Sequence, residues 1–292
     1  MQKYTIVKEE LRTPLNFNFC NIESSIIPVT INGDKKILKI FKRNHNFLDI
    51  KWQVLEYFDQ VRKFFDERFI LPEMIAVNDK QIGYIMRYVN NINLETLLAS
   101  NNIPFSEKLK CLKEMCLLLK DCEKLRHHEQ LSNFYIGDLH VNNLLYNLDT
   151  GHINLCDMDS CMIGCSNPQV YRYLSCSKGI LDLPRKYPNI GGKFIPNENS
   201  DIYCAIMIIM NYLYAGPVEM MDRDAFYKYL YYLDTLKENG MRLFDKNLLY
   251  AFSRVYENGD NINPYPYLDT ISCKSLIKAN NVSYYYSKIK SY

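Results

Sequence analysis

The chain lacks an excess of either charge and lacks a long hydrophobic run. It carries 35 Lys and Arg residues against 33 Asp and Glu, scattered rather than grouped, and its formal net charge is +2. Nucleic acids and acidic membranes attract concentrated positive charge, so we expect neither as a partner. The most apolar segment, residues 202–214, is too short to span a bilayer and is interpreted as a buried helix.

Signals for secretion and for zinc binding are also missing. No basic-then-apolar leader opens the chain, so we expect the thiols of its 10 cysteines to stay reduced. No two cysteines have the Cys-x-x-Cys spacing of a zinc site, and no histidines follow them in register. Hydrophobic residues make up 48% of the chain, enough for a folded core. The sequence therefore indicates a soluble, cytoplasmic protein with buried thiols.

Glycine is scarce near the start of the chain, where Gly33 is the only one before Gly83. Gly33 follows Asn32 between the strand-like runs VTI and KKILKIF, and an Asn-Gly pair in that setting predicts a β-hairpin. Residues 15–27, ahead of the hairpin, contain no glycine. Phosphate-binding loops are often rich in glycine, because glycine lets the backbone approach a phosphate closely. Such a loop is absent from this segment.

The most informative stretch is YIGDLHVNNLLY, residues 135–146, followed by CDMDS, residues 156–160. Asp138 and Asn143 stand five residues apart in a short polar segment. Residues 144–156 then predict two short strands joined by an Asp/Gly turn, and such a hairpin returns Asp157 to the side of Asp138 and Asn143. Two carboxylates and an amide oxygen suit Mg²⁺, a hard cation that often shares its oxygen ligands with nucleotide phosphates. A third carboxylate, Asp159, follows one residue further on.

In order and spacing, these residues resemble the catalytic loop and the metal-binding Asp-Phe-Gly motif of the protein kinase-like superfamily. The resemblance implies that Asp138 orients the attacking hydroxyl or accepts its proton. It also implies that Asn143 and Asp157 hold the Mg²⁺ of Mg²⁺-ATP. In this chain Asp157-Met158-Asp159 replaces Asp-Phe-Gly, and an unconventional loop without glycine, built around residues 21–25, would cover the phosphates.

Upstream segments resemble the small lobe of the same superfamily. Residues 35–44 (KKILKIFKRN) resemble the strand whose lysine pairs with the α- and β-phosphates of ATP, here Lys39. Residues 47–65 have apolar side chains at three-to-four spacing and predict a helix. Glu56, in the middle of this helix, is the candidate for the glutamate that pairs with Lys39, and Asp59 is the alternative.

Residues 83–98 resemble the last strand of the small lobe, the hinge and the start of the next helix. Met86 would border the adenine pocket, and Arg87, Tyr88 and Val89 would form the hinge. The resemblance thus implies that Met86, Tyr88 and Val89 bind the nucleotide.

The resemblance continues in the second half of the chain. Residues 199–216 resemble the central buried helix of the large lobe, and Asp201 in its first turn would accept backbone hydrogen bonds from the catalytic loop. Residues 160–198 contain several prolines and glycines, and correspond to the activation and substrate-binding segment.

The fold implied by this resemblance is α+β and bilobal. An N-terminal lobe, residues 1–88, would contain a small antiparallel sheet and one helix that bind the nucleotide. A mostly helical C-terminal lobe, residues 89–292, would contain the catalytic loop, the metal site and the substrate segment.

The implied function is transfer of the γ-phosphate of ATP, with Mg²⁺ as cofactor, to a protein Ser/Thr hydroxyl. The hinge and the 199–216 helix favour a divergent, bacterial-type protein kinase. A small-molecule kinase is an alternative, because Gly137 precedes Asp138 and His140 follows it, as in aminoglycoside and choline kinases. A second alternative is a pseudokinase scaffold, because the glycine-rich loop is missing and Ile136-Gly137 replaces His-Arg. The retained base and Mg²⁺ residues favour an active enzyme.

Overall fold

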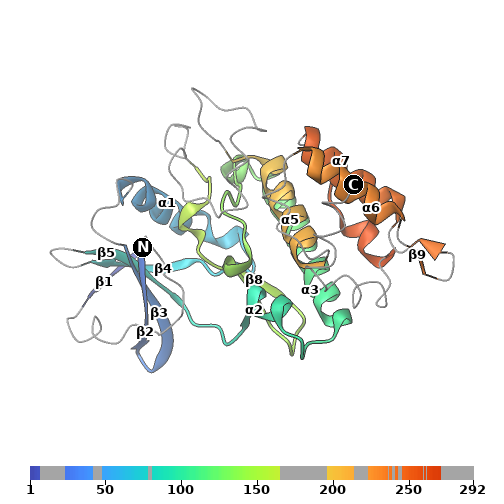
Figure 1. Ribbon diagram of the computed structural model, residues 1–292. Helices are drawn as coiled ribbons and strands as arrows, with labels where there is room; N and C mark the ends of the chain where they lie inside the picture. The colour runs from blue at the N-terminus through green and yellow to red at the C-terminus, as the bar shows by residue number, and fades with distance from the viewer. Residues whose placement is uncertain are drawn as a thin grey trace.

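The computed structural model of the chain describes residues 1–6, 24–41, 48–77, 81–164, 196–213, 223–235, 237–238, 241–242, 245–258, 260 and 262–270. Its elements form two parts (Figure 1): a twisted sheet covered by one helix, and a larger part made mostly of helices. The predicted α+β bilobal fold is confirmed. The division into lobes after residue 88 stays a prediction; the last strand of the main sheet ends at Arg87, and the next element begins at Ile92.

The main sheet has five strands in the order β1-β4-β5-β3-β2. These strands are β1 (Gln2–Thr5), β2 (Ser24–Ile31), β3 (Asp34–Phe41), β4 (Pro72–Val77) and β5 (Ile82–Arg87). Neighbouring strands are antiparallel, except that β1 runs parallel to β4. The predicted antiparallel sheet therefore holds for four strands, and the parallel edge strand at the start of the chain departs from it.

The predicted Asn-Gly hairpin joins β2 to β3. Asn32 and Gly33 have φ values of 53° and 88°, the left-handed backbone that a two-residue hairpin turn requires. Because side chains alternate along a strand, β3 sends Leu38 and Ile40 to one apolar cluster and Ile37 and Phe41 to another. Lys39 projects with Ile37 and Phe41, on the face that the following helix covers.

That helix is α1 (Leu48–Val61), extended by a 3-10 turn over Arg62–Phe64. Buried apolar residues recur at helical spacing along one face, namely Val54, Leu55, Phe58 and Val61. Lys51, one turn before Val54 and Leu55, lies on this same face and is buried. The helix therefore presents one lysine to the interior.

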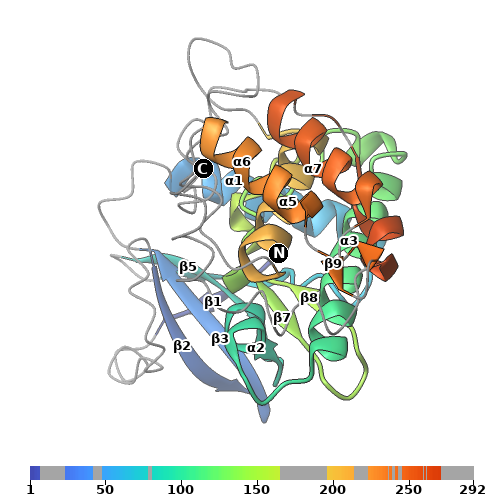
Figure 2. The same cartoon turned by 45° about the vertical axis from the view of Figure 1, so that its right-hand side comes forward.

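The helical part contains five described α-helices and two small sheets (Figures 1 and 2). The helices are α2 (Leu94–Ala99), α3 (Phe105–Leu125), α5 (Glu198–Leu213), α6 (Arg223–Thr235) and α7 (Lys246–Asn258). The short strands β6 (Ile92–Asn93), β7 (Leu144–Tyr146) and β8 (Ile153–Leu155) form one sheet, and β9 (Lys237–Glu238) pairs with β10 (Met241–Arg242). Short 3-10 turns occupy Glu129–Leu131, Val141–Asn143, Met158–Ser160 and Tyr265–Thr270.

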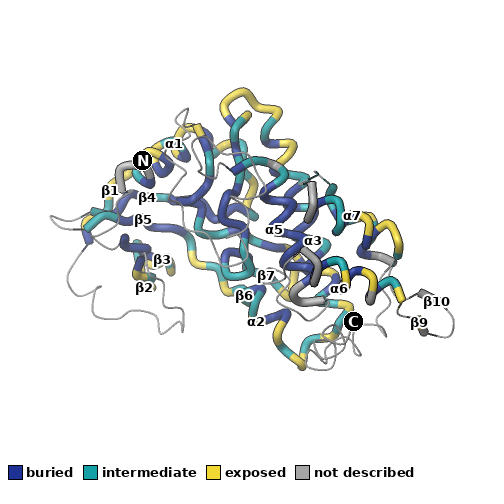
Figure 3. Tube along the Cα trace, turned by 45° about the horizontal axis from the view of Figure 1, so that its top comes forward, coloured by how far each residue is buried: buried dark blue, intermediate teal, exposed yellow. Residues whose placement is uncertain are grey.

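One apolar core joins the two parts of the molecule (Figure 3). It includes the inner face of α1, the buried faces of α3 and α5, and the β7–β8 hairpin. Phe65 contacts Phe69 and Phe134 edge to face, so aromatic packing links the end of α1 to the segment just before Asp138. In α5, residues 202–210 are all buried, which fits the predicted interior helix. None of the helices in the described segments is long and apolar enough to cross a membrane.

Candidate active site

The β7–β8 hairpin brings Asn143 and Asp157 together. Leu144 of β7 pairs with Leu155 of β8, and one residue beyond that pair the backbone N–H of Cys156 donates to the carbonyl of Asn143 at 2.9 Å. Asn143 and Asp157 therefore leave the same end of the hairpin side by side. Asp157 has a left-handed backbone, with φ of 61°, an uncommon conformation for a residue with a side chain. Such strain is concentrated at functional sites.

Asp138 lies next to Asn143 across the tight loop that the sequence singled out. The Asn143 side-chain amide donates to the backbone carbonyl of Asp138 at 2.9 Å, so the amide oxygen remains the atom available to a cation. Asp138 is buried, and its Oδ1 atom has no hydrogen-bond partner within the described structure. A buried carboxylate oxygen without a partner is costly. A substrate hydroxyl at this position would satisfy it.

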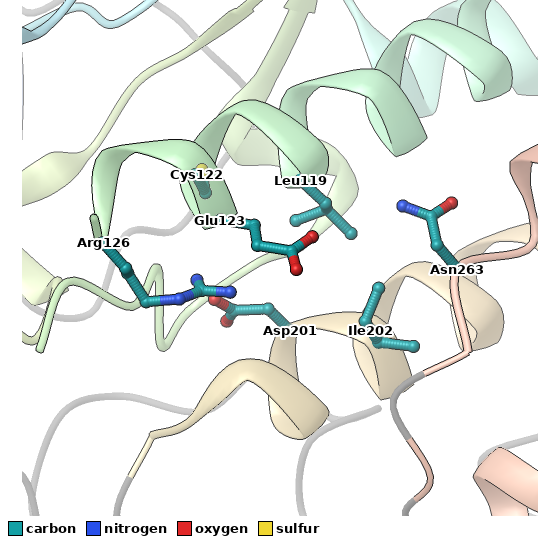
Figure 4. A pocket seen from close by; sticks show the side chains of 7 residues that line it. All are labelled: Leu119, Cys122, Glu123, Arg126, Asp201, Ile202 and Asn263. Atoms are coloured by element: carbon teal, nitrogen blue, oxygen red, sulfur yellow. The ribbon is translucent and has the colours of Figure 1, made fainter. Parts of the chain in front are cut away.

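Asp201 braces this loop from the start of α5. Its two carboxylate oxygens accept the backbone N–H groups of Ile136, at 2.9 Å, and Gly137, at 3.0 Å. Gly137 has φ of 72°, and a Cβ there would approach Pro196 and the carbonyl of Ser160. Figure 4 shows Asp201 between the α5 backbone and Arg126 at the end of α3, beside a small cavity. This cavity lies behind the loop, and nothing about it indicates a substrate site.

Lys39 reaches from β3 to both aspartates of the Asp157-Met158-Asp159 segment. Its ammonium donates to Asp157 Oδ1 and, at 2.6 Å, to Asp159 Oδ2. Lys39 is only 3% exposed, while Lys36 on the same strand pairs with Glu73 near the surface. The strand register thus directs Lys39 to the carboxylates.

The expected contact between Lys39 and Glu56 is not found in the described structure. Glu56 lies on the exposed face of α1, two residues before the buried Phe58, and helical periodicity turns it toward solvent. The alternative, Asp59, is also exposed and pairs with the N-terminal ammonium at 2.5 Å. The helix instead contributes Lys51, whose ammonium donates to Asp159 Oδ1 at 2.5 Å.

Sequence reasoning missed Lys51 as a site residue. The available signal was its position in the apolar repeat of α1, one turn before Val54 and Leu55. A lysine on a buried helix face needs a carboxylate partner. Asp159, an additional acidic residue just after Asp157, was the candidate for this partner.

The charges of this cluster shift one another's protonation. Although burial opposes ionisation, Lys39 and Lys51 hold the pKa of Asp159 well below its usual range. Burial and the neighbouring Asp159 carboxylate raise the pKa of Asp157, against the pull of Lys39. Burial alone would lower the pKa of Lys39, but the two aspartates raise it. Asp159 is thus fixed as an anion, and Asp157 is the carboxylate whose charge responds more readily to its surroundings.

An apolar cluster at the junction of the two parts includes Met86, predicted to border the adenine pocket, and is contacted by Val89, predicted to lie in the hinge. Met86 is buried in it, and Val89 packs against it together with Ile26 of β2 and Leu145 of β7. The third candidate, Tyr88, is 40% exposed and lies beside Lys35. The Tyr88 side chain is therefore not part of this cluster.

Two expected regions fall wholly or partly outside the described residues. Of the segment proposed to cover the phosphates, residues 21–25, only Ser24 and Ser25 are described, and both belong to β2. Of the expected activation and substrate segment, residues 165–195 lie outside the described part of the chain.

The donor atoms fit Mg²⁺ in type. Asp157 and Asn143 supply a carboxylate and an amide oxygen, and Mg²⁺ prefers oxygen ligands. No group of three or more His, Cys, Asp or Glu residues in the described part of the chain could hold a metal ion by protein ligands alone. Mg²⁺ commonly completes its shell with phosphates and water, so a two-residue set suits a nucleotide-bound ion.

Comparison with known proteins agrees with this architecture. No protein-family model matches the chain, and no curated protein sequence matches it. Solved structures do match, 1993 chains in all. One is a kinase, PK-1, of Cydia pomonella granulovirus, which is 15% identical, has a TM-score of 0.53, and is matched over 89% of this chain and 90% of that one. At this identity the likeness establishes the fold: the chain has a protein kinase-like fold.

Proposed function

We propose that the protein is an ATP- and Mg²⁺-dependent phosphotransferase that acts on a Ser/Thr hydroxyl of a protein. The observation that carries this proposal is the contact of Lys39, on the sheet, with Asp157, 118 residues later and beside Asn143 and Asp138. Phosphoryl transfer requires a cation for the phosphates, ligands for Mg²⁺ and a positioned acceptor for a proton. The residues to which we assign these three roles lie close together in the fold, which supports the proposal.

Each residue would act through a specific atom. Lys39 would bind phosphate oxygens through its ammonium, and Asp157 and Asn143 would hold Mg²⁺, which neutralises charge on the phosphates. Asp138 would orient the acceptor hydroxyl and take its proton at a carboxylate oxygen. The hydroxyl oxygen then forms a bond to the γ-phosphorus as the bond to the β,γ-bridging oxygen breaks. Asp201 would hold the loop in place through the backbone N–H groups of Ile136 and Gly137.

Two observations bear on the reaction and on its acceptor. The granulovirus protein to which the fold is similar is named a kinase, which supports phosphotransfer. Gly137 before Asp138 and His140 after it favour the small-molecule alternative. His140 Nε2 lies 3.6 Å from Asp138 Oδ2, and the pKa of His140 is raised by Asp138 in spite of burial. That contact would tune Asp138 whether the acceptor is a protein or a metabolite.

The pseudokinase alternative is weakened by the condition of the site. A scaffold has no physical need for a carboxylate oxygen that is buried without a partner, as Asp138 Oδ1 is within the described structure. Nor does it need a left-handed Asp157. Both features cost free energy in the folded state, and a ligand could offset the first.

The test is phosphate transfer from γ-labelled ATP by the purified chain, with Mg²⁺ and with EDTA. Acceptors would be generic protein substrates in one series, and aminoglycosides, choline and related alcohols in another. We expect Mg²⁺-dependent labelling of protein that is lost in Asp138→Asn and kept in Asp149→Asn, a change at an exposed turn. Labelling only of small alcohols would support the small-molecule alternative. Wild-type protein that neither binds nor hydrolyses millimolar Mg²⁺-ATP would overturn the proposal.

A further inference from the structure

Two lysines and two aspartates form a chain of ion pairs at the junction between sheet and hairpin, in the order Asp157, Lys39, Asp159, Lys51. Asp159 is its centre: Oδ2 accepts from Lys39 at 2.6 Å and Oδ1 accepts from Lys51 at 2.5 Å. Lys39 also contacts Asp157. Each oxygen of the Asp159 carboxylate therefore serves a different lysine, one from β3 and one from α1.

The four side chains differ in depth. The side chain of Asp157 is 24% exposed, whereas that of Asp159 is fully buried and that of Lys51 is 2% exposed. Lys51 also lies over the ring of Phe41, 5.2 Å from its centre, and 3.4 Å from the Ser160 hydroxyl. Asp157 is thus the member open to a ligand, and the Asp159–Lys51 pair lies behind it.

The network is balanced in charge, since two ammonium groups face two carboxylates. Lys39 pairs with both carboxylates. It can therefore turn to bind a phosphate only if another cation neutralises Asp159. Lys51 is that cation. A lysine with two acidic neighbours and no second cation would leave a buried negative charge whenever it turned to a ligand.

We propose that Lys51 is a positioning residue for nucleotide use, acting through Asp159 on Lys39. In this arrangement the carboxylate that fixes Lys39 comes from the turn after Asp157, and the helix supplies the cation that fixes the carboxylate. Residues of α1 also contact the Met158–Ser160 turn, so the position of the helix is tied to that of Asp157. The inference rests on the proposed phosphotransferase function and extends it to the placement of α1.

The test compares four variants with wild type in Mg²⁺-ATP titrations that measure kcat and KM separately. Lys51→Met removes the cation, Lys51→Arg keeps it, and Lys51→Met with Asp159→Asn removes both charges of the pair. Lys36→Met is the matched control, because Lys36 is also an ion-paired lysine of this region, bonded to Glu73 at 2.8 Å away from the cluster. Thermal unfolding of each variant shows that it is folded before kinetics are compared.

We expect Lys51→Met to lower kcat by about ten- to a hundred-fold, the scale of a misplaced reacting group, with a smaller change in KM for ATP. Lys51→Arg should keep most of the activity, and the double variant should recover part of what Lys51→Met loses, because no uncompensated charge remains on Asp159. Lys36→Met should behave as wild type.

Three results would overturn the inference. If Lys51→Met matches Lys36→Met, Lys51 has no positioning role. If the double variant recovers nothing and KM for ATP rises in Lys51→Met while kcat holds, Lys51 contacts the nucleotide itself. If wild-type protein does not bind Mg²⁺-ATP, the proposed function fails and this inference fails with it. If wild type is active and Lys51→Met behaves like Lys36→Met, only the inference about Lys51 fails and the proposed function stands.

Discussion

The ammonium of Lys39 lies 2.6 Å from Asp159 Oδ2, although 120 residues separate them in the chain. This contact connects the central region of the sheet to the turn that follows the β7–β8 hairpin. Both groups are buried, so a substitution that removes either charge leaves the remaining charges of the buried cluster unbalanced. We therefore expect single substitutions at the charged residues of this site to have measurable effects.

Asp157→Asn and Asp138→Asn should separate nucleotide binding from chemistry. Asp157→Asn should weaken Mg²⁺-ATP binding, because it removes a carboxylate expected to be a metal ligand. Asp138→Asn should leave binding nearly unchanged and lower turnover by about two to four decades, the usual contribution of a positioned base. Parallel titrations of binding and of phosphate transfer check this. Equal effects of the two changes on binding would contradict the assigned roles.

Asp201→Ala should loosen the loop that contains Asp138, although Asp201 itself belongs to α5. It removes the acceptor of two backbone N–H groups, those of Ile136 and Gly137, and each buried donor left without a partner costs about 1–3 kcal/mol. We expect a lower free energy of unfolding in urea and lower turnover, with little change in Mg²⁺-ATP binding. Asp201→Asn keeps one acceptor oxygen and should lose less. A stability unchanged by Asp201→Ala would show that the loop does not depend on this brace.

Gly83→Ala should destabilise the sheet, because a Cβ at Gly83 would lie 2.0 Å from the backbone carbonyl oxygen of Lys39. β3 and β5 would have to separate, and overpacking of this kind costs about 1–3 kcal/mol or more. Gly33→Ala is the comparison: its Cβ meets nothing within 4 Å, and only its φ of 88° is unfavourable. Urea unfolding of both variants should rank Gly83→Ala as the more damaging. The reverse order would contradict the tight β3–β5 approach.

His140→Gln should change stability in a pH-dependent way. Against the effect of burial, Asp138 raises the pKa of His140 above its ordinary value of 6.5. A raised folded-state pKa adds stability that is fully present below the unfolded-state pKa and is lost as pH rises through the folded-state value. The substitution should therefore cost more at about pH 5.5 than at about pH 8.5, by at most about 1 kcal/mol for a partly exposed pair.

Urea unfolding of wild type and His140→Gln at the two pH values measures this difference. His152→Gln is a control, because His152 is 58% exposed in its side chain and lies 3.3 Å from Glu114, away from the site. A cost of His140→Gln that is equal at both pH values would show that protonated His140 does not stabilise the fold through Asp138.

Local patterns in the sequence were sufficient to predict the elements whose structure depends on residues near one another in the chain. Asn32-Gly33 predicts the β2–β3 hairpin, because only residues that tolerate positive φ fit its turn. The predicted hairpin over residues 144–156 places Asp157 beside Asn143, because the two strands of a short hairpin begin and end at the same place. The uninterrupted apolar run in residues 202–210 predicts a helix buried on all sides.

The partner of Lys39 was decided by tertiary structure. Glu56 and Lys51 lie on the same helix, and the sequence offered Glu56 because its charge is opposite to that of Lys39. The packing of Val54, Leu55 and Phe58 against the core fixes the rotation of α1, and that rotation turns Lys51 inward and Glu56 outward. An inward lysine then requires a buried acid, and Asp159 supplies it from more than 100 residues away in sequence. The apolar repeat of a helix indicates which of its residues face the core, but the residue that meets an inward lysine is decided by the packing of segments far apart in the chain.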